Sequence, residues 1–376
     1  MLHVKRLTLF LYFLTLVWVL VPYKSYALIT FQDAVFPELA VSGRALAMGN
    51  AFISKVDDSM AAMYNPAGLG TIRNTHLHLS NFYLEGNKDW LNVGTGGTFT
   101  TAVGNFAKSF DLEGVRQLLL TSPGKSTHSR FSVMPNFTTR YFTIGYLFSK
   151  QSRARIKLEP VDALFEFSDR RDHGPYAAIN LSLFGGIIKL GATGVYVNRK
   201  EVISEQDRNT AVNLVPADYS SGSAFIGIGG IKLTLPWYML PTFSATFHNA
   251  LAQNFNADSG SAGAPTRIER LINLGFSLTP QIGQNSRMHF EINFKDISGS
   301  YPGVSGQRKT TAGMEIDIYR ALFIRFGFGD GYGSFGLGIK SQRLELDLTS
   351  YAVDSTTSQF RGAEDRRFAI SLSSGF

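Results

Sequence analysis

The chain has 376 residues, of which 44% are hydrophobic, 13% aromatic and 17% charged. That length suits two soluble domains or one large barrel, and the apolar content excludes an intrinsically disordered protein. With no Cys, the chain is neither a lipidated lipoprotein nor a fold held by disulfide bonds.

Residues 1–27 have the pattern of an export signal peptide. Lys5 and Arg6 precede an apolar run of fifteen residues, Leu7 to Val21, and Ala27 supplies a small residue for cleavage after it. The alternative is a membrane anchor, but the run is shorter than the roughly 20 residues of a spanning helix. Without the three basic residues of this stretch the formal charge falls from +7 to +4. Such a mild excess does not favour nucleic acid as a partner.

Residues 28–72 are predicted to form short helical pieces. The stretch from Ser59 to Tyr64 is dominated by Ala and Met, which favour a helix, and Asp57-Asp58-Ser59 forms an N-cap cluster. Asn65-Pro66 predicts the end of the helix, because the residue before a proline avoids the helical conformation. The small residues would let this stretch thread through a tight enclosure. A helical hairpin on the surface of a soluble domain is the alternative.

From Asn74 onward the pattern changes to strands. Alternation begins at Leu77, and Leu91–Thr101 continues as strand, whereas the spacing in Val103–Leu120 predicts one or two short amphipathic helices within a loop. The further predicted strands are Arg130–Thr139, Tyr141–Lys150, Ile156–Ser168, Tyr176–Phe184, Ile187–Lys200, Ser223–Leu235, Thr242–Gln253, Arg267–Pro280, Arg287–Ile297, Lys309–Ile318, Leu322–Phe328, Ser334–Lys340, Arg343–Val353 and Arg366–Phe376.

The two faces of these strands differ in character. In Arg343–Val353, leucines fill one face and Glu345, Asp347 and Thr349 the other. Connections alternate between tight turns and long polar loops, and many aromatic residues stand at strand ends, as in the girdles of membrane barrels. A soluble β-sandwich would alternate too, but it would not need these aromatics. We therefore predict an all-β fold, a transmembrane antiparallel β-barrel of about 14 strands, given about 20 residues per strand and connection.

The last strand ends on an aromatic residue, as in the signal read by the bacterial barrel-assembly machinery. The predicted insertion signal consists of Phe368, Ile370, Leu372 and Phe376. Charged residues at alternate positions are predicted to line the lumen as ordinary, internally paired polar lining, with a substrate-selecting constriction as the alternative; these are Glu291, Lys295, Arg325, Glu345 and Asp347. A barrel of this width cannot be filled by its own side chains, so residues 28–72 are the candidate plug.

No catalytic constellation is present in the sequence. There is no G-x-S-x-G, and the glycine pattern from Gly331 to Gly336 precedes a strand rather than the helix of a dinucleotide site. His76 and His78 share a strand face, but no third metal ligand follows at a useful spacing. We therefore expect no enzyme activity, no cofactor and no metal.

With these residues in view, the chain resembles the FadL/TodX-type outer-membrane transporters, including their PorV-type relatives. The resemblance rests on Gly43-Arg44-Ala45, Met48-Gly49-Asn50-Ala51-Phe52, Asp57-Asp58-Ser59 and Tyr64-Asn65-Pro66-Ala67-Gly68-Leu69. It implies a 14-stranded barrel in the bacterial outer membrane whose N-terminal segment folds inside as a hatch. The hatch residues carried over are Gly43, Arg44, Met48, Gly49, Asp57, Asp58, Asn65, Pro66 and Gly68.

The resemblance leaves two functions open. In the FadL branch, hydrophobic ligands such as fatty acids or aromatic hydrocarbons enter from outside and leave through a kinked strand into the bilayer. PorV-type relatives share these N-terminal sequence motifs but escort secreted proteins. The expected partners are outer-membrane lipid, the barrel-assembly machinery during biogenesis and, in the first case, a hydrophobic small molecule. No ligand-contacting residue can be carried over.

Overall fold

The computed structural model of the chain describes residues 35, 38–72, 75–95, 108, 110–157, 164–341, 343–356 and 360–375. The predicted signal peptide, residues 1–27, and Phe376 of the predicted insertion signal lie outside these ranges. Within them, no helix combines the length and the apolar character needed to cross a membrane.

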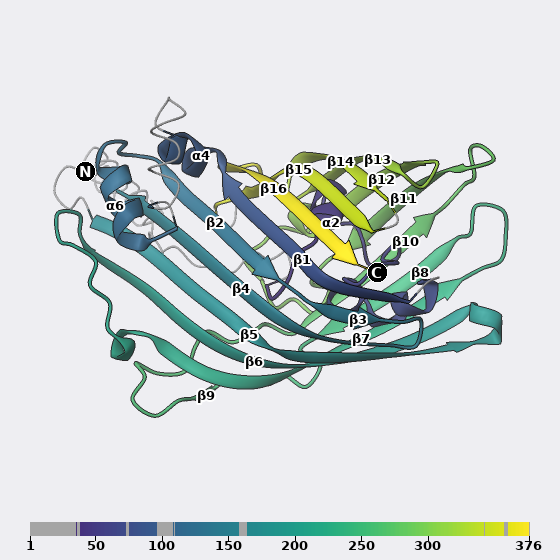
Figure 1. Ribbon diagram of the computed structural model, residues 1–376, viewed down its shortest axis with the longest axis horizontal. Coiled ribbons are helices and arrows are strands. Elements are labelled where there is room, and N and C mark those ends of the chain that lie inside the picture. Colours follow the sequence, from purple (N-terminus) through teal and green to yellow (C-terminus); the bar gives the residue numbers. More distant parts are fainter. Residues whose placement is uncertain are drawn as a thin grey trace, which may run out of the picture.

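Sixteen strands and several short helices follow one another along the described chain (Figure 1). The helices are α2 (Gly43–Ala47), α3 (Ala61–Tyr64), η1 (Pro66–Thr71), α4 (Lys88–Thr95), α6 (Leu112–Leu120), η2 (Phe184–Gly186), η3 (Pro216–Asp218) and α7 (Gly306–Lys309). The strands are β1 (His76–Asn87), β2 (Ser126–Val133), β3 (Asn136–Thr138), β4 (Phe142–Ile156), β5 (Leu164–Leu183), β6 (Ile188–Asp207), β7 (Ser220–Thr234), β8 (Thr242–His248), β9 (Asn256–Ala257), β10 (Leu271–Leu278), β11 (Ser286–Phe294), β12 (Thr310–Ile318), β13 (Leu322–Gly329), β14 (Tyr332–Lys340), β15 (Leu344–Asp354) and β16 (Glu364–Gly375).

The strands close into an antiparallel barrel with 14 strand positions, each called a stave here. β2 and β3 are two pieces of one stave, because both pair with β1 on one side and β4 on the other. β9 pairs with β7 beyond the end of β8 and continues that stave after a break at residues 249–255. Pairing of β1 with β16 joins the first and last described strands, which closes the barrel as a span in lipid requires.

The outer face of the barrel is apolar and the inner face is polar. On β16, Phe368, Ile370 and Leu372 are exposed on the outside, whereas Arg367 and Ala369 are buried inside. The three described residues of the predicted insertion signal therefore lie together on the outer face. An apolar exterior over a polar lumen is the pattern of a barrel that sits in lipid, and the predicted fold class is confirmed.

Two local predictions were wrong. The strand predicted at Leu91–Thr101 is helical over residues 91–95, within helix α4 (Lys88–Thr95), and residues 96–101 lie outside the described ranges. The Asn87 side chain accepts the backbone N–H of Trp90 (2.9 Å) and caps this helix. The two strands expected at Ile156–Ser168 and Tyr176–Phe184 belong, from Leu164 to Leu183, to one strand, β5; Ile156 ends β4, and residues 158–163 lie outside the described ranges. Gly174-Pro175 has a turn composition, but it stays in register with β4 while pairing to β6 skips these two residues. Proline lacks the N–H for that second ladder.

The predicted helix near Tyr64 is present but shorter, since α3 begins at Ala61. Asp58 accepts the N–H of Met60 (2.9 Å), whereas Asp57 is directed toward charged partners. The helix ends at Tyr64, as Asn65-Pro66 predicts, and η1 follows it.

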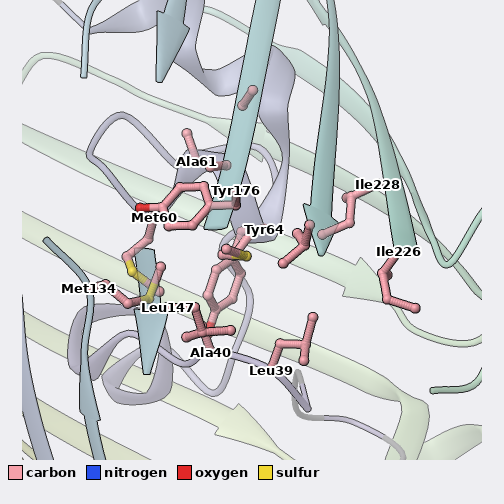
Figure 2. Packing of buried hydrophobic residues seen from close by; sticks show 14 of the residues in the cluster. Leu39, Ala40, Met60, Ala61, Tyr64, Met134, Leu147, Tyr176, Ile226 and Ile228 are labelled. Atoms are coloured by element: carbon pink, nitrogen blue, oxygen red, sulfur yellow. The ribbon is translucent and has the colours of Figure 1, made fainter. Parts of the chain in front are cut away.

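Residues 38–72, called here the N-terminal segment, lie inside the barrel. α2 packs against β13–β16, and η1 packs against β5–β7 on the opposite wall. Figure 2 shows the buried cluster that results, with Met60 and Tyr64 of the segment among Met134, Tyr176 and other wall residues. Part of the hydrophobic core therefore lies between the segment and the wall.

Candidate functional site

Arg44 of α2 is the centre of an ion-pair network between the N-terminal segment and the wall. It is buried and makes a bidentate contact with Glu315 of β12, with both N–O distances 2.7 Å. Its remaining terminal nitrogen, Nη1, contacts Asp57 (2.7 Å) and Asp58 (3.2 Å). Planar guanidinium and carboxylate groups match in such a fork, so Lys could not replace Arg44 equivalently.

The network continues around the barrel wall. Arg325 of β13 donates to Glu315 (2.8 Å) and to Asp347 of β15. Lys55 of the segment contacts Asp57 (2.9 Å) and lies 3.7 Å from Glu315. The prediction that Arg325 and Asp347 face the lumen is thus correct. Glu315 was not singled out, because its role as the partner of Arg44 depends on a contact 271 residues away.

The pKa values of the two adjacent aspartates are shifted in opposite directions. For Asp57, burial alone would raise the pKa, but Arg44 and Lys55 outweigh it and hold the pKa well below its usual range. For Asp58, burial raises the pKa to about 6, opposed by Arg44 and reinforced by the charge of Asp57. Asp58 therefore gains a proton at mildly acidic pH while Asp57 stays ionised.

A second anchor fixes the stretch before α3. Glu291 of β11 accepts the backbone N–H groups of Ser54 (2.7 Å) and Lys55 (2.8 Å) with its two carboxylate oxygens. Asn65, from the sequence motif, bonds within the segment. Its side chain donates to the carbonyl of Ile53 (2.8 Å) and accepts the N–H of Ala67 (3.1 Å). Asn65 thereby joins the end of α3 to the start of η1.

Glycines of the wall form a belt where the backbone of the segment touches the strands. A Cβ placed on Gly327 would lie 2.1 Å from the backbone nitrogen of Gly49, and one on Gly191 would lie 2.2 Å from the carbonyl carbon of Pro66. The belt comes from β6, β7, β10, β12, β13 and β14 and consists of Gly191, Gly230, Gly275, Gly313, Gly327 and Gly336. Any larger residue at these positions would push the segment away from the wall.

The other predicted hatch residues lie along the same contact. Gly43 faces Ser371 of β16, and the carbonyl of Met48 would lie 2.5 Å from a Cβ on Gly313. Gly49 has a φ of +64°, a conformation that favours glycine, and packs on Phe328. Gly68 instead packs within the segment, against Val56. The predicted hatch residues are thus spread along the contact between the N-terminal segment and the barrel wall and do not gather into one compact site.

Glu38 holds the beginning of the segment through a cluster that sequence reasoning missed. Its carboxylate contacts Arg170 of β5 and Arg199 of β6, the latter at 2.8 Å. Arg199 also makes a bidentate contact with Asp172 (2.7 and 3.0 Å). Arg130 donates to the Glu38 carbonyl (2.9 Å). Charged residues alternate along β5 and β6, and this pattern could have predicted the two arginines as lumen-facing. Nothing in the sequence around Glu38 marked it as their partner.

A mainly apolar cavity of about 50 Å³ separates the segment from β7, β8 and β10. Leu39, Met63, Ile226 and Ile228 contribute its apolar lining, and the buried Lys295 is among its polar residues. The cavity adjoins the break between β8 and β9, since Asn249 also lines it. Its volume admits a few water molecules and no larger ligand unless neighbouring residues move.

A second cavity, of about 90 Å³, lies on the short-turn side of the segment and has a different lining. Asp57, Asp58, Lys340 and Glu345 are among its residues. Apolar solutes are poorly solvated next to such charges. Within the described parts of the chain, no group of three or more His, Cys, Asp or Glu is placed to hold a metal ion.

The arrangement defines a class of protein, a 14-stranded barrel with its N-terminal segment packed inside. No protein-family model matches the chain, and neither does any curated protein sequence. Among solved structures, the toluene transporter TbuX of Ralstonia pickettii is similar, with a TM-score of 0.52 and 10% identity over 92% of this chain and 100% of TbuX. The resemblance found in the sequence is thereby confirmed as a likeness of fold.

Other solved structures are similar at lower scores. The toluene transporter TodX of Pseudomonas putida has a TM-score of 0.49 and 11% identity, over 90% of this chain and 99% of TodX. A FadL homologue of Pseudomonas aeruginosa has a TM-score of 0.44 and 11% identity, over 93% and 99%. CdiB from Acinetobacter baumannii has a TM-score of 0.35 and 9% identity, and this chain spans 60% of its length.

Proposed function

We propose that this protein is a passive outer-membrane channel for hydrophobic small molecules, of the fatty-acid or aromatic-hydrocarbon type, with residues 38–72 as the plug of its lumen. The observation that carries the proposal is the apolar cavity between the plug and β7, β8 and β10, which must widen by movement of its lining residues to pass such a solute. The similar barrel TbuX is a toluene transporter, which supports a solute of this class. The protein acts as a channel and not as an enzyme, and it needs no cofactor.

The route favoured by the geometry passes beside the plug and leaves through the wall. Downward passage would lead into the charged cavity around Asp57 and Asp58, which disfavours an apolar solute. The apolar cavity instead adjoins the break at residues 249–255, where regular pairing of β8 with β7 stops and the Ala250 N–H still donates to the Gly227 carbonyl of β7 (2.9 Å). This break is the candidate exit toward lipid.

Filling the cavity tests the proposal. Ile226→Trp enlarges a buried residue of the lining, whereas Ile231→Trp makes the same change on the outer face of β7, where Ile231 is exposed. Uptake of labelled toluene and of labelled oleate by proteoliposomes should fall at least tenfold in I226W and stay unchanged in I231W. Equal uptake by both variants, with the barrel folded, would refute the route.

Lys295 allows the two ligand types to be separated. It is buried at the cavity, and a carboxylate would neutralise its charge there, whereas a hydrocarbon would not. Lys295→Met should lower uptake of oleate and leave uptake of toluene unchanged. A loss of both would show that Lys295 shapes the cavity and does not select a charge.

The runner-up function is a binding or assembly role in protein export, as in PorV-type relatives. The observation in its favour is the height of the wall at β5 and β6, which have 20 residues each and carry α6 and long loops. Pull-down from solubilised outer membranes separates the two functions. A stoichiometric protein partner together with no uptake of toluene or oleate would favour the export role.

A further inference from the structure

A row of three basic residues crosses the outer face of β4, β5 and β6. Lys150 is directly opposite Arg171, and Arg171 is directly opposite Lys200. Thr193 of β6 bonds to the plug, so odd residues of β6 face the lumen and Lys200 faces outward. The three positively charged side chains therefore stand side by side on the outside of the barrel.

Such a row is unfavourable by itself. Residues directly opposite in an antiparallel pair have Cβ atoms about 5 Å apart, and like charges there destabilise the sheet. Among the described residues, the one ion pair of the row joins Arg171 to the buried Asp169, at 3.7 Å. Lys150 donates to the carbonyl of Phe110 (3.1 Å), and Lys200 lies over the ring of Tyr219. The carboxylates of Asp111 and Asp218 also lie near Tyr219, beside Lys200, but among the described residues neither forms an ion pair with the three cations.

The position of the three basic residues along the strands indicates the depth at which they would meet an anionic partner. Outward positions of β5 are apolar from Leu183 up to Pro175, about 20 Å of height at ~3.4 Å per residue and a tilt of about 40°. His173 and then Arg171 follow on this face, with Arg171 at about 30 Å, beyond the apolar band of about 25 Å of such barrels. The row thus lies at the depth of lipid head groups on the long-loop side.

Above the row, the outer wall is covered by protein. Val115 and Leu119 of α6 pack with Phe165 and Phe167 of β5 in a buried apolar cluster. Figure 1 shows α6 beside the upper part of these strands. The row therefore occupies a ledge between the lipid-facing band and a protein roof, and Arg171, whose side chain is 49% exposed, is open to the surroundings.

We propose that Lys150, Arg171 and Lys200 bind the phosphate groups of phosphorylated glycolipid head groups in the outer leaflet. Phosphate carries the charge and the acceptor oxygens that a row of two lysines and an arginine can share. The inference rests on the membrane placement in the proposed function but not on transport. The three residues on β4, β5 and β6 would then hold the tall side of the barrel wall against the lipid surface.

The test compares binding of lipid A with that of dephosphorylated lipid A to the purified full-length barrel in detergent, by native mass spectrometry. Each basic residue near an anionic surface is worth roughly fivefold in affinity. K150Q/R171Q/K200Q should therefore bind lipid A on the order of 100-fold more weakly than wild type. The charge-preserving K150R/R171K/K200R should keep most of the affinity, which separates loss of charge from misfolding.

A matched control removes the same charge elsewhere. R267Q/R270Q/R320Q changes residues in a long loop and a short turn and should bind lipid A like wild type. The proposal is overturned if wild type binds both lipids equally, if K150Q/R171Q/K200Q binds like wild type, or if free inorganic phosphate at the same concentration displaces lipid A. Because binding is measured without uptake, a channel that transports normally but lacks lipid preference overturns this inference alone.

Discussion

Replacing Arg44 by Met should release the plug. The substitution keeps the apolar stem but leaves Glu315, Asp57 and Asp58 without the guanidinium that they share. Removing one partner of a buried ion pair typically destabilises a structure by about 3–5 kcal/mol, an upper limit here because Arg325 still pairs with Glu315 and Lys55 with Asp57. Since every 1.4 kcal/mol is tenfold, the population with an undocked plug should rise by up to roughly 150- to 5,000-fold.

The assay is single-channel conductance in planar bilayers. On the proposal that residues 38–72 plug the lumen, wild type should conduct rarely, whereas R44M should show frequent large openings. Phe52 and Phe323 also lose the cation that lies over their rings (5.2 and 5.9 Å), which adds to the effect. Heat-modifiable gel mobility confirms that the barrel itself is folded.

Arg116→Met is the matched control for this prediction. Arg116 has a similarly small exposed fraction and pairs with the more exposed Glu113 at 2.5 Å, but it lies on α6 outside the lumen. Its loss should leave conductance at the wild-type level. If folded R44M conducts no more often than R116M, the network around Arg44 does not hold the plug, and the reasoning fails.

Three further predictions concern the plug. Gly327→Ala places a methyl group against plug backbone and should raise conductance, whereas Gly333→Ala, whose methyl group would lie 4.0 Å from its nearest neighbour, should not. The pKa of Asp58, about 6, lies above its ordinary value near 4, so wild type should gain about 1 kcal/mol in unfolding free energy as pH falls from 7 to 5. Asp58→Asn should remove that gain, measured by thermal unfolding. Oxidised G43C/S371C, whose Cβ atoms would lie 3.4 Å apart, should keep oleate uptake if solutes pass beside the plug.

Each of these has an outcome that contradicts it. Equal conductance in the two glycine variants would mean that the plug tolerates displacement. A pH dependence that persists in D58N would assign the titration to another group. Loss of uptake in oxidised G43C/S371C, restored by a reductant, would show that the plug must move and would replace the route beside it.

Many residues of the site could be identified from sequence motifs, but the residues that they contact could not. Gly43, Arg44, Asp57 and Asp58 were singled out by their spacing, and the structure brings them to one contact surface with the wall. Their partners could not be predicted, because Glu315 is an ordinary lumen-facing acid until the barrel closes. The glycine belt was equally hidden, since a glycine in a strand looks the same whether it faces lipid, solvent or a plug.

Local pattern also misled where tertiary contacts decide. Gly174-Pro175 has the composition of a turn, yet β5 passes through it because β4 pairs along its whole length. The stretch at Leu91 has strand composition, yet Asn87 caps a helix there. In both cases a contact beyond the local stretch, or one side-chain hydrogen bond, outweighed an intrinsic preference worth a fraction of a kcal/mol.

The sequence by itself indicated strands with one apolar and one polar face, because alternation of side chains along a strand is a local, period-two property. The choice of a barrel over a sandwich rested on the aromatic residues at strand ends and the alternation of tight turns and long loops. It also marked residues 28–72 as different in kind. Only the tertiary structure decided how that stretch is held: Arg44 reaches across 271 residues to Glu315, and Glu38 reaches across 161 to Arg199. Such pairs depend on strand register and barrel closure, which bring together residues that no local pattern relates.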